Sequence, residues 1–128
     1  MKMKKTNFDL FRFQKVTREL LANKDSIETK YGKAIYKQAK VIEKVLETYN
    51  DELEDAKIEF CSVDKNGNIF KEQGTYAYTR ENAISLNKRV KEMLNTEVDL
   101  EIFIKLEQLE HCPKDFLDFY LEFIGKNK

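Results

Sequence analysis

Residues 35–60 read IYKQAKVIEKVLETYNDELEDAKIEF, and apolar residues recur in this stretch at alternating steps of four and three. The repeat consists of Ile35, Ala39, Ile42, Leu46, Tyr49, Leu53, Ala56 and Phe60. In an α-helix this spacing places all of these side chains on one side, as at the a and d positions of a heptad. The stretch therefore predicts one long helix that packs against other helices along its whole length.

The predicted long helix extends from Ile27 to about Cys61, with Ser26 as its N-cap. Gly32 lies near its start and costs about 1 kcal/mol relative to alanine, so regular helix is expected to begin properly only after it. A turn at Asn23–Ser26 precedes the helix. Before that turn, apolar residues at helical spacing predict a first helix over Asn7–Ala22, with Asn7 as its N-cap.

After the long helix the sequence changes character. Asn66-Gly67 lies between β-compatible residues, and Gly74 marks a second turn, so we expect a small hairpin or three-stranded flap. Thr79 is a suitable N-cap for a third helix. Between Val98 and Leu106, apolar and polar residues alternate, which predicts a half-buried strand.

Pro113 suits the first position of a last helix, Lys114–Ile124. This segment is apolar almost all round, so it must be covered on more than one side. Such a helix either completes the core or docks on another chain. The expected fold class is mainly α with a small β element (α+β), in a single domain over residues 1–128.

The composition suits a helix-rich globular chain, with 36% charged and 41% hydrophobic residues. Lys/Arg and Asp/Glu each number 23, so the formal net charge is zero. The charges are unevenly distributed, because residues 1–48 contain 12 basic and 6 acidic residues, whereas residues 49–128 contain 11 and 17. The chain is therefore basic in its first part and acidic in its second.

Lysines recur at steps of three and four on the outward face of the long helix. The basic face consists of Lys30, Lys33, Lys37, Lys40 and Lys44. Further along the same face, Glu47, Asp51 and Glu54 replace the lysines, an order opposed to the helix macrodipole. This pattern has three interpretations. The face is a solvated surface, or an acidic surface or nucleic-acid backbone lies along the lysines, or two copies of the chain pair as an antiparallel homodimer.

No catalytic, cofactor or metal site is predicted. Asp64 begins a stretch that resembles a calcium loop, but Ile69 and Thr75 occupy the positions that need glycine and a bidentate glutamate. His111 and Cys112 are adjacent on the chain, whereas catalytic Cys–His pairs meet through the fold. The expected function is non-enzymatic protein–protein interaction, with nucleic-acid or nucleotide binding as the alternative. Besides the basic face, Phe119 and Phe123 of the last helix are the expected contact residues.

Four segments resemble a group of small proteins encoded by phages and prophages of low-GC bacteria. They are Tyr31–Lys37, Leu46–Glu52, Asp64–Asn68 and Leu94–Leu100, and the helix after Pro113 also fits. The resemblance implies a phage accessory protein that inhibits a host or defence protein or assists assembly. No apolar run approaches the roughly 20 residues of a membrane-spanning helix, so the expected location is the cytoplasm of the host cell, with the two cysteines as free thiols.

Overall fold

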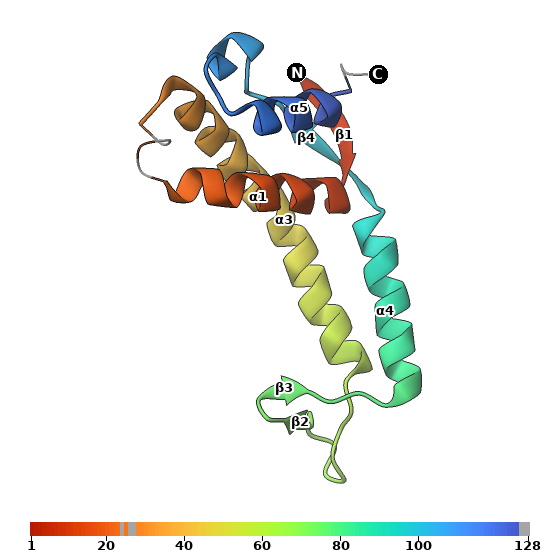
Figure 1. The fold of residues 1–128 in the computed structure, drawn as a ribbon. Helices are drawn as coiled ribbons and strands as arrows, with labels where there is room; N and C mark the ends of the chain where they lie inside the picture. The colour runs from red at the N-terminus through yellow and green to blue at the C-terminus, as the bar shows by residue number, and fades with distance from the viewer. Residues whose placement is uncertain (24, 26–27, 126–128) are drawn as a thin grey trace. The chain divides into compact units, whose positions relative to one another are not determined.

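The computed structural model describes residues 1–23, 25 and 28–125. In chain order its elements are β1 (Lys2–Thr6), α1 (Asn7–Ala22), α3 (Lys30–Phe60), β2 (Lys71–Glu72), β3 (Thr75–Tyr76), α4 (Arg80–Leu94), β4 (Glu97–Glu101), the 3-10 helix η1 (Leu106–Leu109) and α5 (Lys114–Phe123) (Figure 1). The expected class, mainly helical with a small β component, is confirmed.

The chain forms two compact units. Met1–Leu46 and Glu97–Lys128 make the first unit, and Glu47–Thr96 make the second. Helix α3 is continuous through both, with 31 residues and a length of about 46 Å at 1.5 Å per residue. That the chain folds as one domain stays a prediction.

The four-three repeat lies on the buried side of α3, as predicted. Ile35 and Ile42 are 0% exposed and Leu46 is 1% exposed. The helix begins at Lys30 and includes Gly32, so the expectation that regular helix begins only after Gly32 was wrong. The Gly32 N–H donates to the Thr29 hydroxyl at 3.0 Å, the bond of an N-cap that holds this first turn. The predicted start at Ser26 and Ile27 lies outside the described residues.

Helix α1 has the predicted bounds, but its N-cap is Thr6 and not Asn7. The Asp9 N–H donates to the Thr6 hydroxyl at 3.1 Å, and the Thr6 N–H donates to the Asp9 carboxylate at 3.2 Å. This reciprocal pair is a capping box. Asn7 is instead the first residue of the helix and is 5% exposed.

Strand β1 pairs antiparallel with β4, and Met3 lies opposite Leu100. Strand β1 was not predicted, because its residues carry no local strand signal. The strand predicted to reach Leu106 ends at Glu101, because its pairing with β1 ends there: Lys2 lies opposite Glu101, and the Ile102 N–H donates to the Met1 carbonyl at 2.7 Å. Ile102 and Ile104 are both 6% exposed, so the in–out alternation of side chains continues past the end of the strand.

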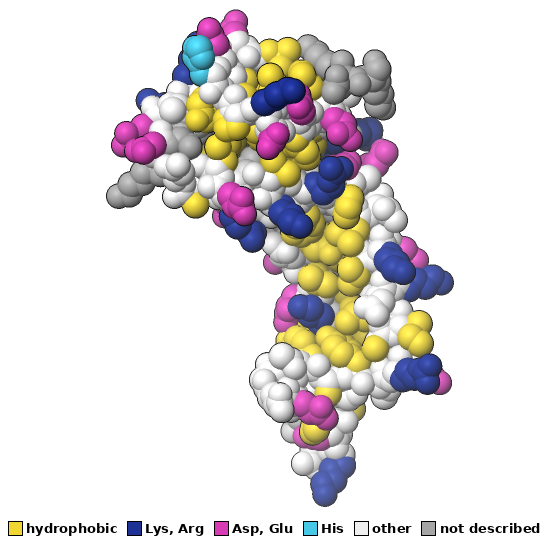
Figure 2. Space-filling model, in the orientation of Figure 1, with side chains coloured by type: hydrophobic (Ala, Val, Ile, Leu, Met, Phe, Trp, Pro, Cys, Tyr) yellow, Lys and Arg dark blue, Asp and Glu magenta, His cyan; other side chains and the backbone are white. Residues whose placement is uncertain are grey.

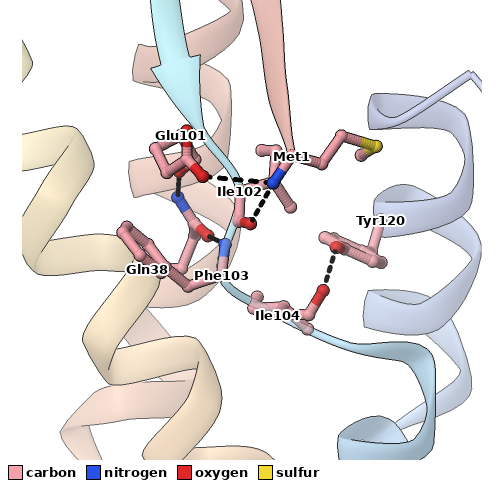
Figure 3. Close-up of polar contacts among 7 residues, drawn as sticks. All are labelled: Met1, Gln38, Glu101, Ile102, Phe103, Ile104 and Tyr120. Carbon is pink, nitrogen blue, oxygen red and sulfur yellow. Dashed lines mark hydrogen bonds and ion pairs between the residues drawn. The ribbon is translucent and has the colours of Figure 1, made fainter.

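A side chain of α3, Gln38, contacts the backbone at the end of β4 and just after it, and is 0% exposed (Figure 3). Its Nε2 donates to the Glu101 carbonyl at 2.9 Å, and its Oε1 accepts from the Phe103 N–H at 2.6 Å. A neighbouring strand would satisfy the same two backbone groups with a backbone N–H and a backbone carbonyl of its own. Gln38 therefore fixes the segment after β4 to α3.

Helix α5 packs on α1 through aromatic rings. The Phe13 ring centroid lies 6.2 Å from that of Phe116 and 5.3 Å from that of Phe123. The Tyr120 hydroxyl donates to the Ile104 carbonyl at 3.0 Å. Pro113 is the N-cap of α5, so its predicted place as the first helical residue was wrong by one position.

In the second unit the predicted turns are present. The Gly67 N–H donates to the Asp64 carbonyl at 2.9 Å, and β2 and β3 form a hairpin around Gln73 and Gly74. Both turn residues have positive φ, 51° and 82°, a region that glycine tolerates best. Thr79 caps α4 as predicted, because its hydroxyl accepts from the Asn82 N–H at 3.1 Å.

Candidate protein-binding surface

The five lysines of the basic face are all exposed in the first unit. They lie on α3 between Lys30 and Lys44, opposite the buried side that carries Ile35, Gln38 and Ile42. The position of the buried side fixes that of the lysines, because residues three and four apart share one side of a helix. The predicted placement of the five lysines is confirmed.

Two exposed aromatic rings lie beside these lysines. The Lys37 Nζ lies 5.0 Å from the centroid of the Phe103 ring, and the Lys40 Nζ lies 5.4 Å from that of Tyr36. Phe103 is 40% exposed and Tyr36 is 45% exposed. A cation over an exposed ring contributes about 0.5–1 kcal/mol, enough to favour this arrangement of the side chains.

Phe103 was not among the contact residues predicted from the sequence. The signal was present, because Phe103 occupies an outward position in the alternating stretch that otherwise carries Glu97, Asp99, Glu101 and Lys105. The structure places it beside Lys37 because Gln38, the next residue on α3, holds its backbone N–H. Phe103 and Tyr36 together form what we call the aromatic edge of the basic face. The position of Phe103 in this edge depends on the buried side-chain amide of Gln38.

Little of the positive charge on this face is neutralised within the described residues. Lys40 pairs with Glu43 at 3.6 Å, and both side chains are more than half exposed. Pairs of this kind contribute between zero and about 1 kcal/mol. Lys30, Lys33 and Lys44 have no ion pair in the described part of the chain.

An open groove of about 560 Å³ adjoins the aromatic edge. Phe103, Ile104 and Tyr120 contribute to its lining, together with Leu106, which is 42% exposed. The groove therefore offers apolar surface close to the lysines. Lys37, Phe103 and the groove belong to the same compact unit.

The acidic continuation of the face lies on the part of α3 that belongs to the second unit. Glu47, Asp51 and Glu54 are exposed there, as expected. Glu54 accepts a hydrogen bond from the Tyr76 hydroxyl at 2.6 Å. This bond to a carboxylate raises the pKa of Tyr76 above its usual value.

The two phenylalanines predicted as contact residues on the last helix have different environments. Phe123 is 6% exposed and packs against Phe13, so it belongs to the core and offers no surface for a partner. The apolar periodicity of α5 could not show which side was covered. Phe119 is half-buried, with the Arg12 guanidinium carbon 5.6 Å from its ring centroid.

The two other candidates from the sequence are Asp64, in the second unit, and His111, in the first. The Asp64 carboxylate accepts from the N–H groups of Asn66 and Asn68 at 2.8 and 3.0 Å, as in a tight turn. His111 is exposed, and its Nε2 lies 3.6 Å from a carboxylate oxygen of Glu110. Across the described residues, no group of three or more His, Cys, Asp or Glu residues is arranged to hold a metal ion.

Comparison of the chain with protein-family models, with curated proteins and with solved structures finds no match. Among the helices of the described segments, none combines the length and the apolar character needed to cross a membrane.

Proposed function

We propose that this protein acts by binding another protein through the basic face of α3 and the aromatic edge beside it. The partner presents an acidic surface with an apolar side chain at its centre. The observation that carries this proposal is the pairing of Lys37 with Phe103, a cation and an exposed ring that are held together by the buried amide of Gln38.

The residue types support a protein partner. Aromatic side chains supply much of the binding energy at protein interfaces, and charges around them contribute to specificity and association rate. Tyr36 and Phe103 offer two rings of this kind, and the adjoining groove accepts an apolar group. Exposed carboxylates such as Glu43 lie beside the lysines, and they would repel a continuous line of phosphates.

With the resemblance to phage-encoded proteins, the proposal takes a specific form. The partner is then a host or defence protein that is inhibited, or a phage protein during assembly, and binding takes place in the cytoplasm of the host cell. A binding role needs no catalytic group, and the proposal invokes no enzymatic step.

The test is affinity capture from bacterial lysate with three forms of the tagged protein. They are the wild type, a charge-reversed variant of the basic face (Lys33→Glu, Lys37→Glu and Lys40→Glu), and a control with the same change of charge elsewhere (Lys65→Glu, Lys88→Glu and Lys91→Glu). The three control lysines are also exposed. We expect one protein to be captured in stoichiometric amount by the wild type and the control but not by the variant of the basic face.

Three results would contradict the proposal. Capture that all three forms share would place the contact elsewhere. Capture that nuclease treatment removes, together with a salt-dependent mobility shift of DNA or RNA, would favour the nucleic-acid alternative. A native mass of twice the chain mass that falls to the monomer value on charge reversal would show that the face pairs with a second copy.

A further inference from the structure

A second apolar groove, also of about 560 Å³, lies between α1 and α5 in the first unit. Val16 and Leu20 of α1 form one wall, and Phe116 and Phe119 of α5 form the other. Val16 is 38% exposed, so the groove is open to solvent. Figure 2 shows hydrophobic side chains gathered between these two helices on the face towards the viewer.

The charged residues that line this groove are both acidic. They are Glu19 of α1 and Asp115 of α5, and both are exposed. Arg12 lies over the Phe119 ring and lines a separate groove that also contains Asp9 and Glu122. The apolar groove is therefore flanked by a carboxylate on each helix and by no lysine or arginine among its described lining residues.

We propose that the groove between α1 and α5 binds a basic amphipathic helix of another protein. Such a helix places apolar side chains at i, i+3, i+4 and i+7 into a hydrophobic groove, and its flanking charges meet the rim. Lysines or arginines on both sides of the apolar stripe would pair with Glu19 and Asp115. This surface takes a partner of the opposite charge to that of the basic face, so the inference stands independently of the proposed function.

The basic helix of a second copy is a poor occupant. The apolar side of α3 is buried in its own unit, with Ile35 and Ile42 at 0% exposure, so only its lysines would reach the groove. Lysines alone would leave the apolar walls uncovered. The chemistry of the groove therefore favours a helix whose apolar stripe is free in the unbound partner.

The test uses a fluorescein-labelled leucine–lysine peptide of about 18 residues, long enough to form a helix when bound. Its leucines occupy helical a and d positions, and a scrambled peptide of the same composition is the control. Fluorescence anisotropy gives the affinities, and amide chemical shifts of the ¹⁵N-labelled protein locate the site. We expect the patterned peptide to bind at least about tenfold more tightly than the scrambled one, a difference of about 1.4 kcal/mol, with shift changes confined to α1 and α5.

Two groove variants and one control complete the design. Val16→Glu places a charge at a solvent-open position and is expected to weaken binding about tenfold or more, a loss of about 1.4 kcal/mol. Glu19→Lys with Asp115→Lys is expected to reverse the preference, so that a leucine–glutamate peptide of the same pattern binds more tightly. Lys65→Glu, at an exposed lysine of the second unit, is expected to leave the affinity for the leucine–lysine peptide unchanged. Circular dichroism confirms that each variant is folded.

The inference is overturned if the scrambled peptide binds as well as the patterned one, or if the shift changes lie outside α1 and α5. It is also overturned if neither peptide binds, or if the native mass increases with concentration and Val16→Glu abolishes that increase, because a second copy would then occupy the groove. None of these results bears on capture through the basic face, so the two proposals fail separately.

Discussion

The side-chain oxygen of Gln38 accepts a hydrogen bond from the backbone N–H of Phe103 at 2.6 Å, and this bond ties the first third of α3 to the segment that follows β4. The same amide donates to the carbonyl of Glu101 at 2.9 Å. A fully buried glutamine of this kind is costly unless both ends of its amide are paired, and here both are. Gln38 thus joins the core of the first unit to the aromatic edge of its basic face.

Gln38→Leu is expected to lower the free energy of unfolding by about 1–3 kcal/mol, because it leaves the Phe103 N–H and the Glu101 carbonyl, both in part-buried hydrogen bonds, without their side-chain partner. Chemical denaturation measures the change. Gln14→Leu, at a half-buried glutamine of α1, is the matched control and is expected to change stability by less than about 0.5 kcal/mol. Equal losses of unfolding free energy in the two variants would show that the hydrogen bonds of Gln38 contribute little to stability.

Tyr120 gives a prediction about stability at alkaline pH. Burial raises the pKa of Tyr120 to about 12, above its usual value near 10. The folded state therefore favours the neutral phenol, and this contribution to stability is complete below pH about 10 and is lost as pH rises towards about 12. Denaturation midpoints measured across this pH range should fall for the wild type.

In Tyr120→Phe the ring remains but the titrating group and the hydrogen bond to Ile104 are absent. This variant is expected to be less stable at neutral pH by about 1 kcal/mol. Its stability should fall less steeply than that of the wild type between pH about 10 and about 12, where lysines titrate in both proteins. Identical alkaline slopes would contradict the assignment.

Phe13 is the centre of the aromatic cluster between α1 and α5. It is 0% exposed, and its ring centroid lies within 6.2 Å of those of Phe116, Phe119 and Phe123. Phe13→Ala is expected to cost about 3–5 kcal/mol in unfolding free energy, because a cavity remains where the ring was. Phe8→Ala, on the same helix but at a site that is 51% exposed, serves as the control.

Loss of the N-cap at Thr6 is expected to lower the free energy of unfolding by less than the Phe13→Ala substitution does. Thr6→Ala removes the acceptor of the Asp9 N–H and is expected to cost about 1 kcal/mol, whereas Thr6→Ser keeps the hydroxyl and should cost much less. Thermal melting of the three proteins measures both changes. A serine variant as unstable as the alanine variant would show that the methyl group of Thr6, and not its hydroxyl, is what matters.

The helices could be predicted from the sequence because their signals are local. The periodicity of Leu10 and Phe13 gave the bounds of α1, and the four-three repeat gave the buried side of α3. Thr79 was recognised because capping residues act within one turn of their own helix. The prediction of Asn7 as the cap of α1 was wrong by one position, because threonine and asparagine both cap helices well and Thr6 directly precedes Asn7.

Strand β1 could not be predicted because its stability is not local. Its sequence, KMKKT, lacks a hydrophobic alternation, and it is a strand because β4, more than ninety positions away in the chain, pairs with it. The end of β4 was missed for a related reason. Side-chain alternation shows which residues face inward, but it does not show where the pairing with β1 ends.

The basic face was predicted residue by residue, since lysines opposite a buried side must point to solvent. The role of Phe103 and the burial of Phe123 were not, because each depends on which elements pack around it. The acidic rim of the second groove also required the structure. Glu19 and Asp115 are 96 positions apart in the chain and share a groove only because α5 lies on α1.

Thr6 ends β1 and also caps α1, so no residue separates the strand from the helix. The orientation of α1 relative to β1 is therefore set at this junction, because no linker residue can adjust it. Insertion of one residue into the start of α1 would turn the rest of the helix by about 100° relative to the sheet. Phe13 would then point away from the α5 rings that it contacts, and Leu10 would leave its buried position. Insertions that loops elsewhere in the chain can accommodate would therefore be excluded at this position.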